Sequence, residues 1–378
     1  MGLGRSPRER LPDVDFAFDE TQDAVRDLAA QIFSGQATVE RVKEIEASDE
    51  RFDRKLWGEL AKADLLGLAL PEADGGGGLG MVELSLILGE QGRVVAPVPL
   101  LPTVLAALVI AEFGSDEQRA AWLPGVIAGD TVLSLAVAEP GGADPSRPTT
   151  TAEPSGDGWT VTGTKLSVPY GHVAERVLVP VTSAGEVGIF LVDPSAADRQ
   201  VAEATDRSKV AHLTFDATPA ERLDGAGGAA LEWLLARYRT GLAALQVGVC
   251  RAALDMAAEY TSNRHQFGRP LSTNQGVALR AADAYIDIRA IDVTLWQAAW
   301  RIDEGRDATK AAMVAKWWAS DGGQRVVHAT QHLHGGMGAD IDYPVHRYFL
   351  WGKTIEQTLG GPGQQLASLG TALAEVTA

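Results

Sequence analysis

The spacing of hydrophobic positions divides the chain into three regions. In the first, from residue 14 to about 130, apolar side chains recur at helical spacing between short breaks. The segment DETQDAVRDLAAQIF predicts a helix for which Asp19 or Thr21 is a candidate N-cap. Four consecutive glycines at 75–78 exclude a regular helix there, because glycine is a poor helix former. The predicted apolar face of the first helix consists of Val25, Leu28, Ala29 and Ile32.

The pattern changes at about residue 131. Between 131 and 225, five short segments are rich in β-branched residues and are separated by Gly, Pro, Asp or Ser. This is typical of strands in an antiparallel sheet or barrel. The segments are VLSLAVAEP, WTVTGTKLSVPYG, ERVLVPVTS, EVGIFLVD and HLTFDATPAERL.

Helical spacing returns from about residue 226 to the end. We therefore predict an α+β fold that is mostly α. Its domains are a helical domain at 1–130, a β-barrel-like domain at 131–225 and a helical bundle at 226–378. Within 276–304, apolar residues recur every three or four positions and predict a broad buried stripe. The stripe consists of Ile286, Ala290, Val293, Trp296 and Trp300.

The composition favours a soluble enzyme over a membrane protein or a nucleic-acid-binding protein. The 378 residues are 46% hydrophobic and 22% charged, as in soluble globular enzymes, and no apolar run is long enough to predict a membrane span. A net charge of −17 argues against nucleic acid as a partner. The N-terminus lacks a secretory pattern, and its MGLG start matches a myristoylation context only weakly, so we expect no lipidation. The single cysteine, Cys250, cannot form an internal disulfide, which favours the cytoplasm.

Two segments contain residues that suggest a functional site. His332 and His334 are two positions apart and would not share a helix face, and no cluster of ligand-type residues accompanies them, so we expect no metal site. Near the C-terminus, KTIEQTLGGPGQQL has the glycines of a tight turn, yet Leu359 at its head cannot transfer a proton.

Three motifs resemble the acyl-CoA dehydrogenase family. PEADGGGGLGMVELSLILGEQGR is similar to the family's N-terminal pattern, RHQFGRPLSTNQ to its R-x-x-F-G signature, and HGGMGADIDYPVHRYF to its GG-x-G segment. Their order and separation match the family. The resemblance implies an N-terminal helical domain, a central antiparallel β domain and a C-terminal four-helix bundle. It also implies FAD, which takes hydride from Cβ of an acyl-CoA while a carboxylate removes the Cα proton.

The resemblance also locates the base, and this chain lacks it. The usual family glutamate falls on Leu359, and the alternative position, directly before Arg239, falls on Tyr238. Glu356, nearly one helical turn before Leu359, is a candidate displaced base, with a structural glutamate as the favoured interpretation. Ala236 stands where an aspartate of the family's CoA cleft is common, which puts acyl-CoA binding by this chain in doubt.

The flavin-contact segments of the family are altered as well. Ala138, Ser167 and Pro169 occupy positions where the family has Thr, Trp and Thr against the flavin ring. Proline has no N–H to donate and serine cannot stack, so we predict an impaired flavin pocket in this chain. The residues that define the fold are retained at Glu139, Pro140, Gly163, Lys165 and Gly171.

A second set of family contacts is intact. In the family these residues reach across a subunit interface to the adenosine diphosphate half of a neighbour's FAD, for which the planar fork of arginine is well suited. The predicted contacts are Arg264, Gln266, Phe267, Gln275, His332, Gly335 and Gly336.

This asymmetry resembles one subunit of heteromeric α2β2 acyl-CoA dehydrogenases of actinobacterial steroid degradation. The leading hypothesis is a non-catalytic subunit that completes the FAD site of a paralogous partner, the partner holding the glutamate and the acyl-CoA. Two alternatives stay open. One is a homo-oligomeric flavoenzyme with different chemistry, such as flavin-dependent oxygenation, and the other is a non-enzymatic scaffold.

Overall fold

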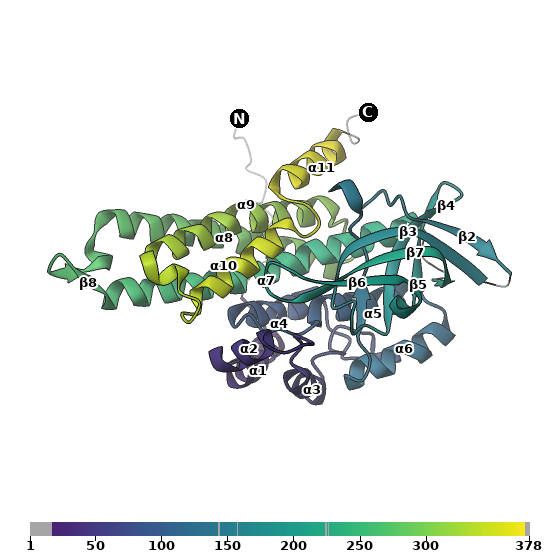
Figure 1. Ribbon diagram of the computed structural model, residues 1–378, viewed down its shortest axis with the longest axis horizontal. Coiled ribbons are helices and arrows are strands. Elements are labelled where there is room, and N and C mark those ends of the chain that lie inside the picture. The colour runs from purple at the N-terminus through teal and green to yellow at the C-terminus, as the bar shows by residue number, and fades with distance from the viewer. Residues whose placement is uncertain (1–16, 143, 157, 224, 226, 375–378) are drawn as a thin grey trace, which may run out of the picture.

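The computed structural model describes residues 17–142, 144–156, 158–223, 225 and 227–374. The MGLG start lies outside the described residues. Helices, a sheet and a second set of helices follow one another along the chain, as predicted (Figure 1). The N-terminal helices are α1 (Glu20–Gln36), α2 (Val39–Glu46), α3 (Arg54–Lys62), α4 (Met81–Arg93), α5 (Leu100–Phe113) and α6 (Asp116–Ala128), with a 3₁₀ turn η1 at Glu72–Asp74.

The first helix begins at the predicted cap. The Asp19 carboxylate accepts a hydrogen bond from the backbone N–H of Gln22 at 2.8 Å, and the Gln22 side chain accepts one from the Asp19 N–H in return. This reciprocal pair satisfies two of the helix's free N–H groups. The buried face consists of Val25, Ala29 and Phe33, whereas the predicted Leu28 is 40% exposed.

The central strands form a closed barrel with two additional edge strands. The order β4-β2-β3-β7-β5 returns to β4, while β1 pairs with β4 and β6 pairs with β7. The β1–β4 pair is parallel, unlike the antiparallel pairing that the pattern predicts. The strands are β1 (Leu133–Leu135), β2 (Thr151–Ser155), β3 (Gly158–Pro169), β4 (Arg176–Ser183), β5 (Glu186–Val192), β6 (Asp198–Glu203) and β7 (Lys209–Arg222), with 3₁₀ turns η2 (Pro140–Gly142) and η3 (Pro194–Ala196).

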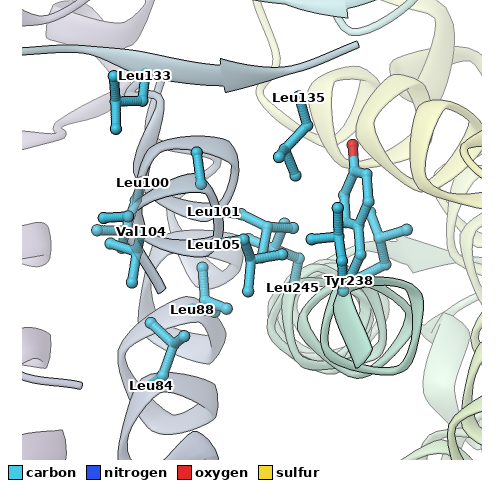
Figure 2. Close-up of a cluster of buried hydrophobic side chains, with 14 of the residues drawn as sticks. Leu84, Leu88, Leu100, Leu101, Val104, Leu105, Leu133, Leu135, Tyr238 and Leu245 are labelled. Carbon is cyan, nitrogen blue, oxygen red and sulfur yellow. The ribbon is translucent and has the colours of Figure 1, made fainter. Parts of the chain in front are cut away.

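The C-terminal helices form the bundle that the family resemblance implies. The central helix of the bundle, α7, also packs against α4 and α5 of the N-terminal region. Figure 2 shows Leu101 and Leu105 of α5 and Leu245 of α7 near Tyr238, with Leu84 and Leu88 of α4 farther from it. Close contact requires glycine, because a Cβ on Gly248 would lie 2.0 Å from the carbonyl oxygen of Gly89. The bundle elements are α7 (Gly228–Asn263), α8 (Gln275–Asp303), α9 (Thr309–Leu333), α10 (Val345–Gln357) and α11 (Pro362–Ala374), with a short hairpin β8 (His265–Gln266) and β9 (Arg269–Pro270) and 3₁₀ turns η4 (Leu271–Thr273) and η5 (Gly335–Ala339).

Helix α7 is an exception to the prediction that no apolar run is long enough to span a bilayer. By length and composition it could do so, but 67% of its most apolar window is buried inside the fold. A helix buried in the core of a soluble protein can have the same length and apolar composition.

The stripe predicted on α8 was placed on the wrong side of the helix. The core-facing residues include Ala284, Ile288, Ile291 and Leu295. Trp296 is partly buried against the core. A second apolar row, spaced by seven residues, faces outward with exposed fractions between 45% and 63%. It consists of Leu279, Ile286, Val293 and Trp300. Periodicity identifies an apolar face, but it does not decide which of two such faces is covered within one chain.

The transitions between regions lie near the predicted domain boundaries. Helix α6 ends at Ala128 and β1 begins at Leu133, while β7 ends at Arg222 and α7 begins at Gly228. The division into domains at 130/131 and 225/226 stays a prediction.

Candidate functional site

A cleft of about 1200 Å³ lies between the barrel, α7 and the turn that joins α10 to α11. Leu135 on β1 and Leu101 on α5 form part of its apolar wall. Tyr238 rises from α7 with its hydroxyl directed away from the helix, beside Leu135 (Figure 2). The volume is that of a site for a sizeable organic ligand.

Both positions predicted for the family base line this cleft. Leu359 lies in the turn after α10 with φ +60°, a left-handed conformation that a leucine adopts only when its surroundings impose it. Burial raises the pKa of Tyr238 far above physiological pH, so its phenol stays protonated. Neither group is suited to remove a proton.

Glu356 is not placed to act as the base in this cleft. Its side chain is 4% exposed and is absent from the lining of the cleft. The carboxylate accepts hydrogen bonds from Lys353 Nζ and from Gln357 Nε2. These contacts favour the structural interpretation of Glu356.

A buried lysine holds the turn around Leu359 through hydrogen bonds to its backbone. Lys316, on α9, is fully buried, and its Nζ donates to Ser320 Oγ at 2.6 Å, to the carbonyl oxygen of Glu356 at 3.1 Å and to that of Gly360 at 3.4 Å. Burial, together with the nearby charge of Arg239, lowers the pKa of Lys316 to about 7. The backbone of this turn is therefore held in place although its base is absent.

The three altered flavin-contact positions also line the cleft. Ala138 offers no hydroxyl and Pro169 no N–H. The N–H of Ser167, at φ +50°, donates to His212 Nδ1 at 3.1 Å. A wall built in this way has fewer donors for the polar edge of a flavin than the family pattern provides.

The predicted contacts for a neighbour's FAD lie at the other end of the bundle, where the β8–β9 hairpin projects beyond the helices (Figure 1). Phe267, at the hairpin tip, is 93% exposed. The ring of Tyr260 stacks on that of His334 with centroids 4.9 Å apart, which brings the end of α7 next to the end of α9. The predicted residues at this end are all exposed: Arg264, Gln266, Phe267, Gln275, His332, Gly335 and Gly336.

The glycines at this end leave room for close approach. Gly335 has φ +58°, which favours glycine, and a Cβ added to Gly335 or Gly336 would meet nothing within 4 Å. Exposed arginine and aromatic side chains beside an open glycine turn are chemically suited to a nucleotide diphosphate. We therefore find that the residues present fit one half of an FAD site.

His332 and His334 lie in different surroundings. His332 lines a second hollow of about 680 Å³ between α8 and α9, together with Arg280 and Arg325. Among the described residues, no group of three His, Cys, Asp or Glu side chains is placed to hold a metal ion.

Sequence patterns gave no role to two polar residues that line the cleft, Arg239 and Asp206, or to Lys316, which donates to the turn around Leu359. Arg239 entered only as a motif marker, and Lys316 and Asp206 were not singled out. Burial raises the pKa of Asp206, which lines the cleft at the β6–β7 turn and accepts hydrogen bonds from Ser208. No local pattern signals these residues, because their setting depends on segments far apart in the chain.

Comparison with known proteins agrees with the architecture. Residues 19–130 match the model of the acyl-CoA dehydrogenase N-terminal domain, and residues 225–371 match that of the C-terminal domain. Acyl-CoA dehydrogenase FadE27 of Mycobacterium tuberculosis is 37% identical over 97% of this chain and 100% of its own length.

Two solved structures are similar over almost the whole chain. One is described as the Tcur3481-Tcur3483 steroid ACAD G363A variant, with 50% identity, a TM-score of 0.91, and coverage of 95% of this chain and 99% of that one. The other is the ChsE4-ChsE5 complex of Mycobacterium tuberculosis, with 36% identity, a TM-score of 0.91, and coverage of 96% and 99%. From its motifs, fold and relatives, this chain belongs to the acyl-CoA dehydrogenase family.

Proposed function

We propose that this chain is the non-catalytic subunit of a heteromeric acyl-CoA dehydrogenase. It completes the FAD site of a paralogous partner that carries the catalytic glutamate and binds the acyl-CoA. The observation that carries the proposal is the cleft itself, in which Leu359 and Tyr238 occupy both base positions. FAD, when bound, supplies the hydride acceptor for α,β-dehydrogenation, and the residues of this chain contribute binding and orientation.

The two ends of the molecule support this division of roles. The cleft has no carboxylate at either base position and few donors for a flavin edge. The opposite end presents Arg264, Phe267 and the open Gly335–Gly336 turn to solvent, where a second chain can reach them. Homologues in the family bind FAD, and we infer that this end holds the diphosphate half of the partner's FAD.

The nature of the partner follows from the relatives. One of the two similar structures is a complex of ChsE4 with ChsE5, and the other, Tcur3481-Tcur3483, is a steroid ACAD. We propose a paralogous acyl-CoA dehydrogenase chain as the partner, an α2β2 assembly, a steroid-derived acyl-CoA as the substrate of the complex, and a cytoplasmic location.

The outward row of α8 is proposed as part of the contact with the partner. Ile286→Glu should weaken assembly about a hundredfold, because a carboxylate would be buried without a counter-ion at an apolar contact. Sedimentation of the co-purified complex measures the change. Val201→Glu, which also replaces an exposed apolar residue but lies on β6, is the control and should leave assembly intact. Normal assembly of the Ile286 variant would exclude α8 from the interface.

The isolated chain provides the test of function. Purified alone, it should oxidise no acyl-CoA and retain no stoichiometric FAD, and co-expression with an adjacently encoded dehydrogenase should yield an active complex. Leu359→Glu should leave the isolated chain inactive, because a base does not replace the missing flavin contacts. Stoichiometric FAD and acyl-CoA oxidation by the chain alone would refute the proposal.

A further inference from the structure

The cleft contains a buried guanidinium group whose donors are unused. Arg239, on α7, is 2% exposed and lines the cleft. Its Nε and Nη1 atoms are buried and have no hydrogen-bond partner in the structure. Buried polar groups are nearly always hydrogen-bonded, and leaving a charged donor unsatisfied is costly.

The neighbours of Arg239 do not neutralise it. The charge of Arg239 helps to lower the pKa of Lys316, so Lys316 is no counter-ion for it, and the Nζ of Lys316 already donates to three oxygen atoms. Among the described residues, no carboxylate lies within 4 Å of the guanidinium of Arg239 as an ion-pair partner. Asp144 and Glu232 attract it electrostatically, but both are exposed at the mouth of the cleft.

Carboxylates also line the cleft, but they do not pair with Arg239. Glu139 is paired with Lys165, and Asp206 accepts hydrogen bonds from Ser208. The remaining carboxylates are exposed: Asp144, Glu203 and Glu232. A dehydrogenase cleft places an anionic base against the substrate, whereas here Leu359 stands at that position and the buried donors without a partner belong to Arg239. A ligand that fits would bring the negative charge itself.

The remainder of the cleft favours an apolar ligand body. With about 1200 Å³, it is far larger than a simple anion needs. Its apolar wall includes Val98, Leu101, Leu135, Leu242, Leu245 and Leu359.

We propose that the cleft of this subunit binds an apolar monocarboxylate, with the carboxylate on Arg239 and the hydrocarbon body against the leucine wall. The ligand class is a free acid rather than a thioester to be oxidised. Binding there involves no bond making or breaking, so the cleft acts as a ligand site of the non-catalytic subunit.

Calorimetry on the full-length chain with three probes tests this site. Decanoate supplies both the charge and the apolar body, decan-1-ol only the body and acetate only the charge. Because hydrogen bonds to charged groups are the strong ones, decanoate should bind at least about tenfold more tightly than decan-1-ol. Acetate should bind more weakly than decanoate by at least the same factor. Equal affinities for decanoate and either other probe would overturn the proposal.

Two variants assign the contacts. Arg239→Gln should raise the Kd for decanoate at least about tenfold and leave that for decan-1-ol unchanged. Leu242→Trp, which fills the cleft from the same helix, should abolish binding of both. The matched control is Arg237→Gln, since the Arg237 guanidinium donates to the carbonyl oxygen of Trp233 and does not line the cleft.

An unchanged Kd for decanoate in a folded Arg239→Gln variant would overturn the proposal. If that variant does not fold, as judged by circular dichroism, the three-probe comparison on the unaltered chain decides alone. The inference is separate from the proposed function, because the FAD contacts lie at the far end of the bundle (Figure 1). If the cleft binds no decanoate, the FAD content and the activity of the complex are still expected to follow the proposed function.

Discussion

Arg264→Ala in this chain should lower the affinity of the assembled complex for FAD by about ten- to a hundredfold, although neither family base position of the chain holds a carboxylate. Arg264 lies at the C-terminal end of α7, exposed, with its backbone N–H bonded to the carbonyl oxygen of Tyr260 at 2.8 Å. Its side chain is thus available to a diphosphate without a change in the backbone. The loss reflects charge-assisted hydrogen bonds that alanine cannot make.

The measurement is FAD retention and turnover of the complex over a range of added FAD. Excess FAD should restore much of the turnover, since the proposed function assigns the chemistry to the partner. Phe267→Ala should act in the same direction, because a side chain that is 93% exposed in one chain contributes little to that chain's own stability. Val201→Ala serves as the control for loss of an exposed apolar side chain. Undiminished FAD affinity in both the Arg264 and Phe267 variants would show that this end makes no cofactor contact.

Glu139→Gln should destabilise the chain by about 3–5 kcal/mol, as expected when one partner of a buried ion pair is removed. Lys165 is fully buried and its Nζ lies 2.7 Å from Glu139 Oε1. The Glu139 carboxylate also accepts hydrogen bonds from the backbone N–H and hydroxyl groups of Thr149 and Thr150, at 2.6–3.0 Å. Glutamine would leave the buried ammonium group without a counter-charge.

Urea unfolding of the purified chain measures the loss. Glu139→Gln combined with Lys165→Met removes both charges, and it should be less destabilised than Glu139→Gln alone. If the single variant unfolds at the same urea concentration as the unaltered chain, the ion pair does not stabilise the barrel wall.

The same carboxylate predicts an acid dependence of stability. Burial opposes ionisation of Glu139, but the hydrogen bonds from Lys165 and Thr149 outweigh it and lower the pKa of the group from 4.5 to about 2. Between these values the unfolded chain binds more protons, so the contribution to the unfolding free energy is complete above pH 4.5 and is lost as pH falls through 2. Glu139→Gln should flatten this part of the stability profile, and an unchanged slope would assign the acid dependence to other groups.

Local patterns predicted the architecture where one periodicity dominated. The Asp19 cap and the succession of helices, strands and helices are confirmed. Strand β2 was missed because Pro154 and polar residues interrupt its pattern, and β6 because it lies at an exposed edge. The parallel pairing of β1 with β4 joins Leu133 to Arg176, and strand composition does not specify such a distant partner.

Charged groups in the interior illustrate a second limit. The family resemblance identified Glu139 and Lys165 as retained residues, but it did not predict that they pair. The fold brings them together although they are 26 positions apart in the sequence. Arg239 and Lys316 lie on different helices, and neither has a sequence signal that separates a buried cation from an exposed one. Ile286 shows the converse, since its apolar character predicted burial and the described chain leaves it exposed.

The number of FAD molecules per chain tests the division of roles most directly. The complex with the partner is purified, its flavin is released by denaturation and quantified by absorbance, and the two chains are quantified by amino-acid analysis. We predict one FAD per two chains, with the loss of one FAD site for each copy of this chain that carries the Arg264 and Phe267 substitutions. One FAD per chain, with this chain's own cleft occupied, would contradict the account.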